Sequence, residues 1–337
     1  MELLEKASAV YKENFSNHAW FGKCIFLSWY CTIGDCTFCY RSTIKENVTP
    51  ETARRSFPSI LIEALFCKAF NWRLEFITGG YGILPFEETK KICKVISEIM
   101  GEKIWLNLGV LSKKQLEELK PYVKGIVASI ETINPELHKK VCPSKPIAPY
   151  EHMFSYADGF EKSITFIVGL GETIADFELL QKFIEKHNIN RITFYALKPV
   201  RGTEYEHTTG PKSEYYAEWI ARTRIAFPKL EIMAGITPRR AEDVEIILRA
   251  GANAVTKFSA TKLFNSERAH LFEAKAKSAG REFLSSLTKM PDIDWDGWID
   301  SLDIDEVTKK DTKILIQHYL HRMNKPKSLE PIHLVLD

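Results

Sequence analysis

Short apolar runs that alternate with helical segments constrain the fold of this 337-residue chain more than any other feature. Each run is about five to nine residues long and rich in Ile, Leu, Phe, Trp or Val, which is typical of strands buried on both faces. The runs therefore predict strands at residues 23–31, 72–80, 103–110, 125–132, 163–170, 191–199, 230–237 and 254–258.

The segments between these runs have the signals of helix ends. Thr49, Pro50 and Glu51 predict a helix start, and the helix should run to about residue 70. Gly101 is a typical stop for the preceding segment, and Ser112 is a typical N-cap. The other predicted helices are 86–100, 112–119, 173–187, 212–226 and 240–250.

Strand–helix alternation of this kind predicts parallel strands joined by right-handed crossovers. Eight such units favour a (β/α)8 TIM-type barrel, and an open doubly wound sheet is the alternative. We expect an N-terminal helical segment at 1–20, the barrel domain at 21–289 and a C-terminal extension at 290–337.

Composition excludes several other classes of protein. Hydrophobic residues make up 45% and charged residues 27%, the balance of a soluble globular chain. The net charge of +2 argues against a protein that grips nucleic acid phosphates. The sequence has neither a signal-peptide pattern nor an apolar run of membrane-spanning length. We therefore expect a cytoplasmic protein that binds neither nucleic acid nor membrane.

Three of the seven cysteines form a tight group, Cys31, Cys36 and Cys39, directly after the first predicted strand. An odd count and clustering disfavour a disulfide framework, which leaves metal binding as the better interpretation. Three thiolates converging in one loop suit an iron–sulfur cluster with one open iron. A zinc knuckle would need a second ligand pair, and three inert buried cysteines would sit oddly among polar neighbours.

This loop resembles that of the radical S-adenosylmethionine (SAM) superfamily, whose usual spacing is Cys-x3-Cys-x2-Cys with an aromatic residue before the third cysteine. Here Phe38 is that aromatic residue, and the spacing is Cys-x4-Cys-x2-Cys. The resemblance implies that Cys31, Cys36 and Cys39 bind a [4Fe–4S] cluster and that SAM is a second cofactor. It also implies that Phe38 and Tyr40 lie beside the cofactors.

Two further motifs extend the resemblance. Thr78, Gly79 and Gly80 match the glycine-rich motif that receives the SAM amino group, although Tyr81 follows where an acid is common. Glu131 opens a segment similar to one in the [FeFe]-hydrogenase maturase, and by that resemblance it contacts SAM. A simple glycine turn and a helix-capping acid are the alternative interpretations.

A third motif contains Gly169 and Gly171 and matches the Val-Gly-Leu-Gly-Glu-Thr of biotin synthase, where backbone approaches the adenosyl group. The similarity covers roughly residues 24–258 and points to the branch with biotin synthase, the hydrogenase maturase and methylornithine synthase. By alignment, the ligands of the second cluster of biotin synthase are replaced. The residues at those positions are Ile77, Trp105, Ser163 and Glu231.

The resemblance implies an enzyme that cleaves SAM reductively to a 5′-deoxyadenosyl radical, which takes hydrogen from a small substrate in cofactor biosynthesis. The implied partners are an electron donor such as ferredoxin or flavodoxin and, in some members, a partner enzyme or carrier protein. The alternatives are a sulfur-insertion subunit of a two-protein lipoyl synthase, a non-catalytic iron–sulfur scaffold and a metal-independent barrel lyase using Lys198 or Lys257.

No catalytic residue is identified by these patterns. The side chains predicted to face the barrel suit a small polar or heteroaromatic substrate: Tyr81, Asn107, Tyr195, Arg201 and Met233. Of the remaining cysteines, Cys67 and Cys93 are expected to be small core residues. Cys24 is expected at the base of the first strand, far from the catalytic face. Cys142 follows the fourth strand and could approach the site.

Overall fold

The computed structural model describes residues 2–325 and contains a closed barrel of eight parallel strands. Neighbouring strands follow chain order from β2 to β8, and β1 closes the ring by pairing with both β8 and β2. The strands are β1 His18–Phe26, β2 Arg73–Thr78, β3 Ile104–Asn107, β4 Val123–Glu131, β5 Glu161–Val168, β6 Arg191–Ala196, β7 Glu231–Gly235 and β8 Ala254–Thr256. The predicted (β/α)8 barrel is therefore confirmed.

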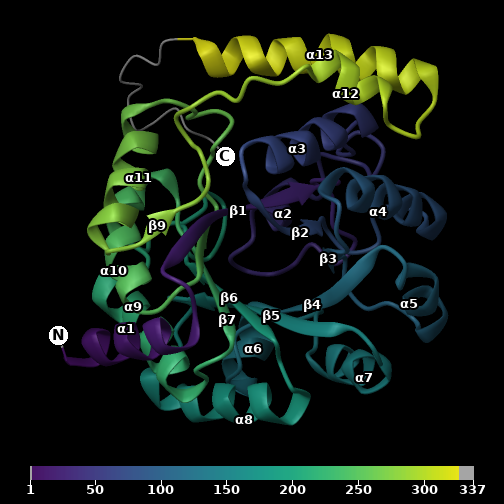
Figure 1. Ribbon diagram of the computed structural model, residues 1–337. Helices are drawn as coiled ribbons and strands as arrows, with labels where there is room; N and C mark the ends of the chain where they lie inside the picture. The colour runs from purple at the N-terminus through teal and green to yellow at the C-terminus, as the bar shows by residue number, and fades with distance from the viewer. Residues whose placement is uncertain (1, 326–337) are drawn as a thin grey trace.

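Helices follow the strands and surround the barrel (Figure 1). Those between β1 and β5 are α2 Tyr40–Ile44, α3 Phe57–Ala69, α4 Phe86–Met100, α5 Lys113–Leu119, α6 Pro135–Val141 and α7 Ala148–Tyr156. Those after β5 are η1 Ile174–Asp176, α8 Phe177–His187, α9 Ser213–Ala226, η2 Pro238–Asp243, α10 Val244–Arg249 and α11 Glu267–Ser278.

Additional elements lie outside this repeat. Helix α1 (Glu2–Asn14) packs against α9 and α10, and the short β9 (Glu282–Phe283) pairs with the first residues of β1. Helix α12 (Trp295–Asp300) packs on α13 (Glu306–Asn324), which lies along α3 (Figure 1). The predicted extension from residue 290 continues past residue 325, outside the described residues. Among helices of the described chain, none combines the length and apolarity that crossing a membrane requires.

Several predicted helix ends are found in the structure for the expected reasons. Gly101 ends α4 in the left-handed conformation with φ of +70°, which favours glycine. Ser112 and Gln115 form a reciprocal capping box at the start of α5. These local signals were therefore sufficient to place the end of α4 and the start of α5.

The first strand starts and ends earlier than predicted, at His18 and Phe26 instead of residues 23–31. Of its first five residues only His18 is polar, so the apolar run extends further back than predicted, and the backbone of these residues pairs with β8 and β9. Leu27 donates its backbone N–H to Thr78 at 2.8 Å, after which the chain leaves the sheet. The cysteine loop therefore begins four residues before Cys31.

The helix predicted to start at Thr49 begins instead at Phe57 and keeps a proline in its first turn. The segment before it is held against the end of β1: Arg55 donates its backbone N–H to Leu27, and Ala53 accepts one from Trp29, both at 3.0 Å. Because these bonds require a non-helical backbone, the Thr49 signal produces only a turn.

The core between the barrel and its helices is aromatic on the side of α8 and α9. Phe166 on β5 is fully buried, and its ring lies 5.0 Å from that of Trp219 and 5.7 Å from that of Phe194. Because these side chains are closely packed, the neighbours of a large side chain cannot fully close the cavity that its removal leaves.

Replacing Phe166 by alanine is therefore expected to lower the free energy of unfolding by about 3–5 kcal/mol, measured by urea denaturation of the apoprotein. The control Ile314→Ala changes a side chain on α13 that is 53% exposed, and should cost no more than about 0.5 kcal/mol. Equal losses in the two variants would contradict this description of the core.

Candidate active site at the carboxyl ends of the strands

The cysteine loop lies over the carboxyl ends of β1 and β2. Tyr81, directly after the Thr-Gly-Gly motif of β2, donates its backbone N–H to the Cys31 sulfur at 3.3 Å. Gly80 permits this approach, because a Cβ at this position would lie 1.8 Å from the Tyr30 carbonyl oxygen and 2.6 Å from the Cys31 Cβ. The second-strand glycine therefore packs against the first-strand loop.

The other two cysteines are fixed by contacts with neighbouring loops. Cys39 precedes the short helix α2 and donates its backbone N–H to the Cys36 carbonyl at 3.1 Å. Thr37, between them, donates its N–H to Val141 at 3.0 Å and accepts one from Glu204 at 3.1 Å. The loops after β4 and β6 thus meet the cysteine loop.

Cys142 also reaches the site, since its side chain lies against Cys36 in a small cluster with Leu170 and Leu197. A hydrogen bond from the Cys142 thiol is the main influence that lowers the pKa of Cys36. Burial opposes it, and the Lys145 ammonium adds to it. Burial raises the pKa of Cys39. The three thiols of the motif therefore sit in different environments.

Among the described residues, no group of three or more His, Cys, Asp or Glu side chains is close enough to hold a single metal ion. A cubane of four irons and four sulfides is larger than one ion and holds its ligand sulfurs further apart.

Buried polar atoms without a partner gather around the cysteines. Within the described chain such atoms include Asp35 Oδ1, Thr37 Oγ1, Tyr40 OH and Arg41 Nε. Buried polar groups are normally hydrogen-bonded, so a concentration of unpartnered ones points to a polar ligand. Burial also raises the pKa of Tyr40 to about 12, so its phenol is neutral. The loop therefore fits a cofactor with several polar groups.

Glu131 lies at the end of β4 in a strained position, with a positive φ of +63°. Its carboxylate pairs with Lys145 at 2.6 Å and accepts a hydrogen bond from Thr165 at 3.3 Å. Both members of the ion pair are nearly buried. Burial lowers the pKa of Lys145, but the neighbouring Glu131 carboxylate outweighs this and holds it well above the usual value. This pair places opposite charges beside Cys36.

The glycine motif after β5 is a turn closed by its own acid. Gly169 and Gly171 both have positive φ, of +109° and +122°. The Glu172 carboxylate accepts backbone N–H groups from Gly169, Leu170 and Gly171, at 2.7, 2.9 and 3.2 Å. The carboxylate therefore fixes the shape of the turn. At Gly171 the backbone is not crowded by neighbouring atoms.

The positions aligned with the second cluster of biotin synthase hold no thiolate. The Arg191 guanidinium stacks on Trp105 at 3.8 Å and donates to Ser163 Oγ at 3.3 Å. Glu231 forms an ion pair with Arg73. Ile77 packs in the hydrophobic core. A stacked cation and polar side chains therefore occupy this end of the barrel.

The other residues predicted to face the barrel have varied positions. Asn107 accepts a hydrogen bond from Ser129 at 3.1 Å, and Met233 is buried beside Gly22. Tyr81 packs on Gly109, whereas Arg201 is exposed in the loop after β6. As predicted, Cys67 and Cys93 are buried in the core, on α3 and α4.

Cys24 is not at the base of its strand, as had been expected. It lies two residues before the end of β1, and its thiol donates to the Glu75 carboxylate at 2.8 Å. The earlier position of β1 explains the difference, because the strand ends at Phe26 instead of at Cys31.

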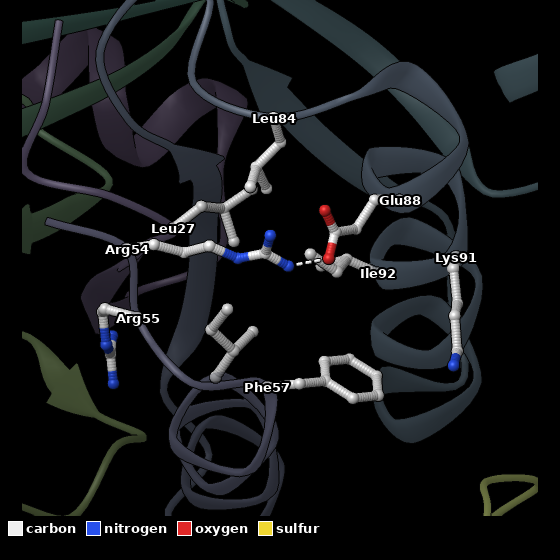
Figure 2. Close-up of a pocket in the computed structure, with 9 residues that line it drawn as sticks. Leu27, Arg54, Arg55, Phe57, Leu84, Glu88, Lys91 and Ile92 are labelled. Carbon is white, nitrogen blue, oxygen red and sulfur yellow. Dashed lines mark ion pairs between the residues drawn. The ribbon is translucent and has the colours of Figure 1, made fainter. Parts of the chain in front are cut away.

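A cavity of about 170 Å³ lies elsewhere, between the end of β1 and helices α3 and α4 (Figure 2). Figure 2 shows Arg54 and Glu88 paired across it, with Phe57 and Lys91 on the helix side. None of the three motif cysteines lines it. We therefore assign the candidate site to the cysteine loop and not to this cavity.

The fold and this site define a parallel barrel with a cysteine-based cofactor site at its catalytic face. The sequence profile of the Radical SAM superfamily matches residues 28–184, which include the cysteine loop and the Thr-Gly-Gly motif after β2. The glycine turn after β5 also lies within that range.

Comparison with known proteins agrees with this match. The chain is 34% identical over 300 residues to an uncharacterized protein of Methanocaldococcus jannaschii, covering 87% of this chain and 82% of that protein. It is 29% identical to a biotin synthase of Clostridium tetani, over 54% of this chain and 58% of the enzyme. The crystal structure of methylornithine synthase superposes with a TM-score of 0.66 at 21% identity, covering 76% of each chain.

The chain belongs to the radical SAM superfamily. It is therefore an enzyme of the class that uses a [4Fe–4S] cluster and SAM.

The sequence analysis did not single out three charged side chains that make contacts at or near the candidate site: Glu75, Lys145 and Glu172. Glu75 lies inside a predicted strand, Lys145 in a loop, and Glu172 was read only as part of the glycine motif. The one available signal was charge, since Glu75 interrupts an apolar run that should be buried on both faces.

The buried ion pair gives a test of this site. Lys145→Met leaves the Glu131 charge buried without its partner and is expected to lower the free energy of unfolding by about 3–5 kcal/mol. The matched control is Lys124→Met, which breaks an exposed pair with Glu102 and should cost about 1 kcal/mol or less. Similar losses for the two variants in urea denaturation of the apoprotein would argue against a buried pair.

Proposed function

We propose that this enzyme cleaves SAM reductively and uses the 5′-deoxyadenosyl radical to take hydrogen from a small substrate in cofactor biosynthesis. The observation that carries the proposal is the loop containing Cys31, Cys36 and Cys39, which lies over the open end of the barrel among unpartnered buried polar atoms. Bound there, a reduced cluster would supply the electron that breaks the sulfonium C–S bond of SAM.

We assign Cys31, Cys36 and Cys39 as the cluster ligands. The Tyr81 N–H contacts the Cys31 sulfur at 3.3 Å. The Cys142 thiol, and after it the Lys145 ammonium, lower the pKa of Cys36 and so favour its thiolate. The loop supplies three thiolates, which leaves one iron for a non-protein ligand. The widened first gap is accommodated by Gly34, whose φ of +56° turns the chain between the first two cysteines.

We assign the SAM contacts to the strand ends around this loop. The β2 motif and Glu131 offer oxygen acceptors for the ammonium and ribose hydroxyl groups, and the open turn after β5 gives backbone room to approach the adenosyl group. Phe38 and Tyr40 border the cysteines on the third side, where the Tyr40 hydroxyl has no partner in the described chain. The residues so assigned are Phe38, Tyr40, Thr78, Gly79, Gly80, Glu131, Gly169 and Gly171.

We place the small substrate at the catalytic face of the barrel, where the surrounding strands and loops would exclude water from the reaction. The named relatives are synthases of biotin and of methylornithine, which supports a small molecule. The stacked Arg191 and Trp105 occupy the region where biotin synthase carries its sulfur source, which favours bond rearrangement over sulfur insertion. We expect the electron to come from a carrier such as ferredoxin or flavodoxin.

The ligand assignment predicts that Cys36→Ala loses the cluster. Wild-type protein, reconstituted without oxygen, should bind about four irons per chain, as a cubane requires, and release 5′-deoxyadenosine from SAM after reduction. The variant should bind much less iron and release none.

The matched control is Cys93→Ala, which removes a thiol that is fully buried on α4, away from the loop. Its iron content and SAM cleavage should equal those of wild type. Iron binding without SAM cleavage in wild type would favour a scaffold, and an unchanged iron content in Cys36→Ala would overturn the ligand assignment.

Gly80→Ala tests the contact between the two strand ends. The added methyl group would overlap the Tyr30 carbonyl and Cys31, so the loop must move and iron incorporation should fall sharply. Gly280→Ala is the control for glycine loss: no atom lies within 4 Å of its Cβ position, and its φ of +73° makes the substitution strain the backbone without an overlap with the cysteine loop. Iron content is measured after the same reconstitution, and equal incorporation by the two variants would contradict the close approach.

A further inference from the structure

Inside the barrel lies a second polar group, which we call the interior cluster: Cys24, Glu75, Tyr195 and Thr256. The Glu75 carboxylate is fully buried and accepts hydrogen bonds from all three others. Tyr195 donates at 2.5 Å and Cys24 at 2.8 Å. A buried carboxylate is thus held by a phenol, a thiol and a hydroxyl.

The interior cluster lies in the space enclosed by the strands. Cys24 and Tyr195 both pack against Phe76, Trp105 and Val127, which come from β2, β3 and β4. Side chains from β1, β2, β3, β4 and β6 can meet only in the middle of the ring. Cys24, Tyr195 and Thr256 lie near the carboxyl ends of β1, β6 and β8. They therefore lie toward the catalytic face of the barrel.

Two members of the cluster are partly exposed. Cys24 and Tyr195 keep accessible surface, whereas Ile25 after Cys24 and Phe194 before Tyr195 are buried. Thr193, on the same face of β6 as Tyr195, is fully buried, and its hydroxyl has no partner in the described part of the chain. The partly exposed Tyr195 therefore lies on the same face of β6 as a buried hydroxyl that has no partner among the described residues.

The thiol keeps its hydrogen in this environment. Burial raises the pKa of Cys24 well above its usual value, and the Glu75 carboxylate raises it further. Burial and the same carboxylate raise the pKa of Tyr195. Both groups are therefore protonated at neutral pH, and the Cys24 S–H is oriented by its hydrogen bond to Glu75.

We propose that Cys24 is a hydrogen-atom donor to carbon radicals formed in the barrel. The inference rests on the proposed function, because it needs a radical to act on. An S–H bond is weaker than the C–H bond of an alkyl group, so transfer from Cys24 to an alkyl radical is downhill. Tyr195 and Thr256 complete the hydrogen bonding of Glu75, which acts as a positioning residue.

The step balances in atoms and electrons. The carbon radical takes one hydrogen atom from Cys24, so the S–H bond breaks, a C–H bond forms and a sulfur-centred radical is left. One electron from the low-potential carrier that serves the enzyme, together with one proton from water, restores the thiol. The substrate class is therefore one whose radical product must regain hydrogen, as in a rearrangement or a reductive cleavage.

The test uses SAM itself, so no substrate has to be known. Reconstituted enzyme is reduced with titanium(III) citrate in thiol-free D2O, where the Cys24 thiol carries deuterium. Without substrate, the 5′-deoxyadenosyl radical should take this deuterium, and mass spectrometry should show 5′-deoxyadenosine shifted by one mass unit. Isotope content is independent of how much SAM is cleaved.

The variant Cys24→Ser keeps a hydrogen-bond donor for Glu75 but replaces S–H by the stronger O–H bond, so the mass shift should be lost. The control Cys93→Ala should retain it. A shift that is equal in Cys24→Ser and wild type, or absent in wild type that cleaves SAM, would overturn the donor role alone. Wild type that cleaves no SAM would overturn the proposed function and this inference together.

A second measurement needs no variant. A nitrone spin trap added to the wild-type reaction should leave its mass on the peptide that contains Cys24. Adducts found only on other peptides would refute the donor role, even if Cys24→Ser does not fold.

Discussion

Closure of the barrel by β1 is the constraint on which the site depends. Because this strand pairs with both β8 and β2, its carboxyl end is fixed next to the end of β2. The backbone bond from Leu27 to Thr78 and the contact of Gly80 with Cys31 follow directly from that pairing. An open sheet would keep only one of these two pairings, so the end of β1 would be held from one side instead of two.

The interior of the barrel differs in chemistry along its axis. The end away from the cysteines contains the stacked Arg191 and Trp105, and the Arg73–Glu231 pair adds further charge. Toward the catalytic face, neutral hydrogen-bond donors surround Glu75. Between the two, apolar Val127 and Phe76 fill the space. The two ends are joined directly, because the Arg191 guanidinium donates to the Glu75 backbone carbonyl at 2.8 Å.

Most of the fold could be predicted from local patterns, whereas parts of the site could not. Strand–helix alternation indicated the barrel, and Gly101 and Ser112 fixed helix ends because their signals act within one turn. Thr49 failed because Arg55 is bonded to Leu27, far away in sequence. The cysteine spacing indicated the superfamily, but the Lys145–Glu131 pair and the contact of Cys142 with Cys36 depend on how two loops fold over the barrel. Tertiary contacts of this kind leave no periodic signal in the sequence.

The unpartnered atoms around the cysteines have a consequence for the stability and degradation of the protein in a cell. Groups such as the Thr37 and Tyr40 hydroxyls have no partner within the described chain, so a ligand that pairs with them would stabilise the folded loop by mass action. A chain without that ligand would then open more often at this loop and present it to proteases. Iron and SAM supply would then set the abundance of the enzyme as well as its activity, and chains that never receive a cofactor would be removed first.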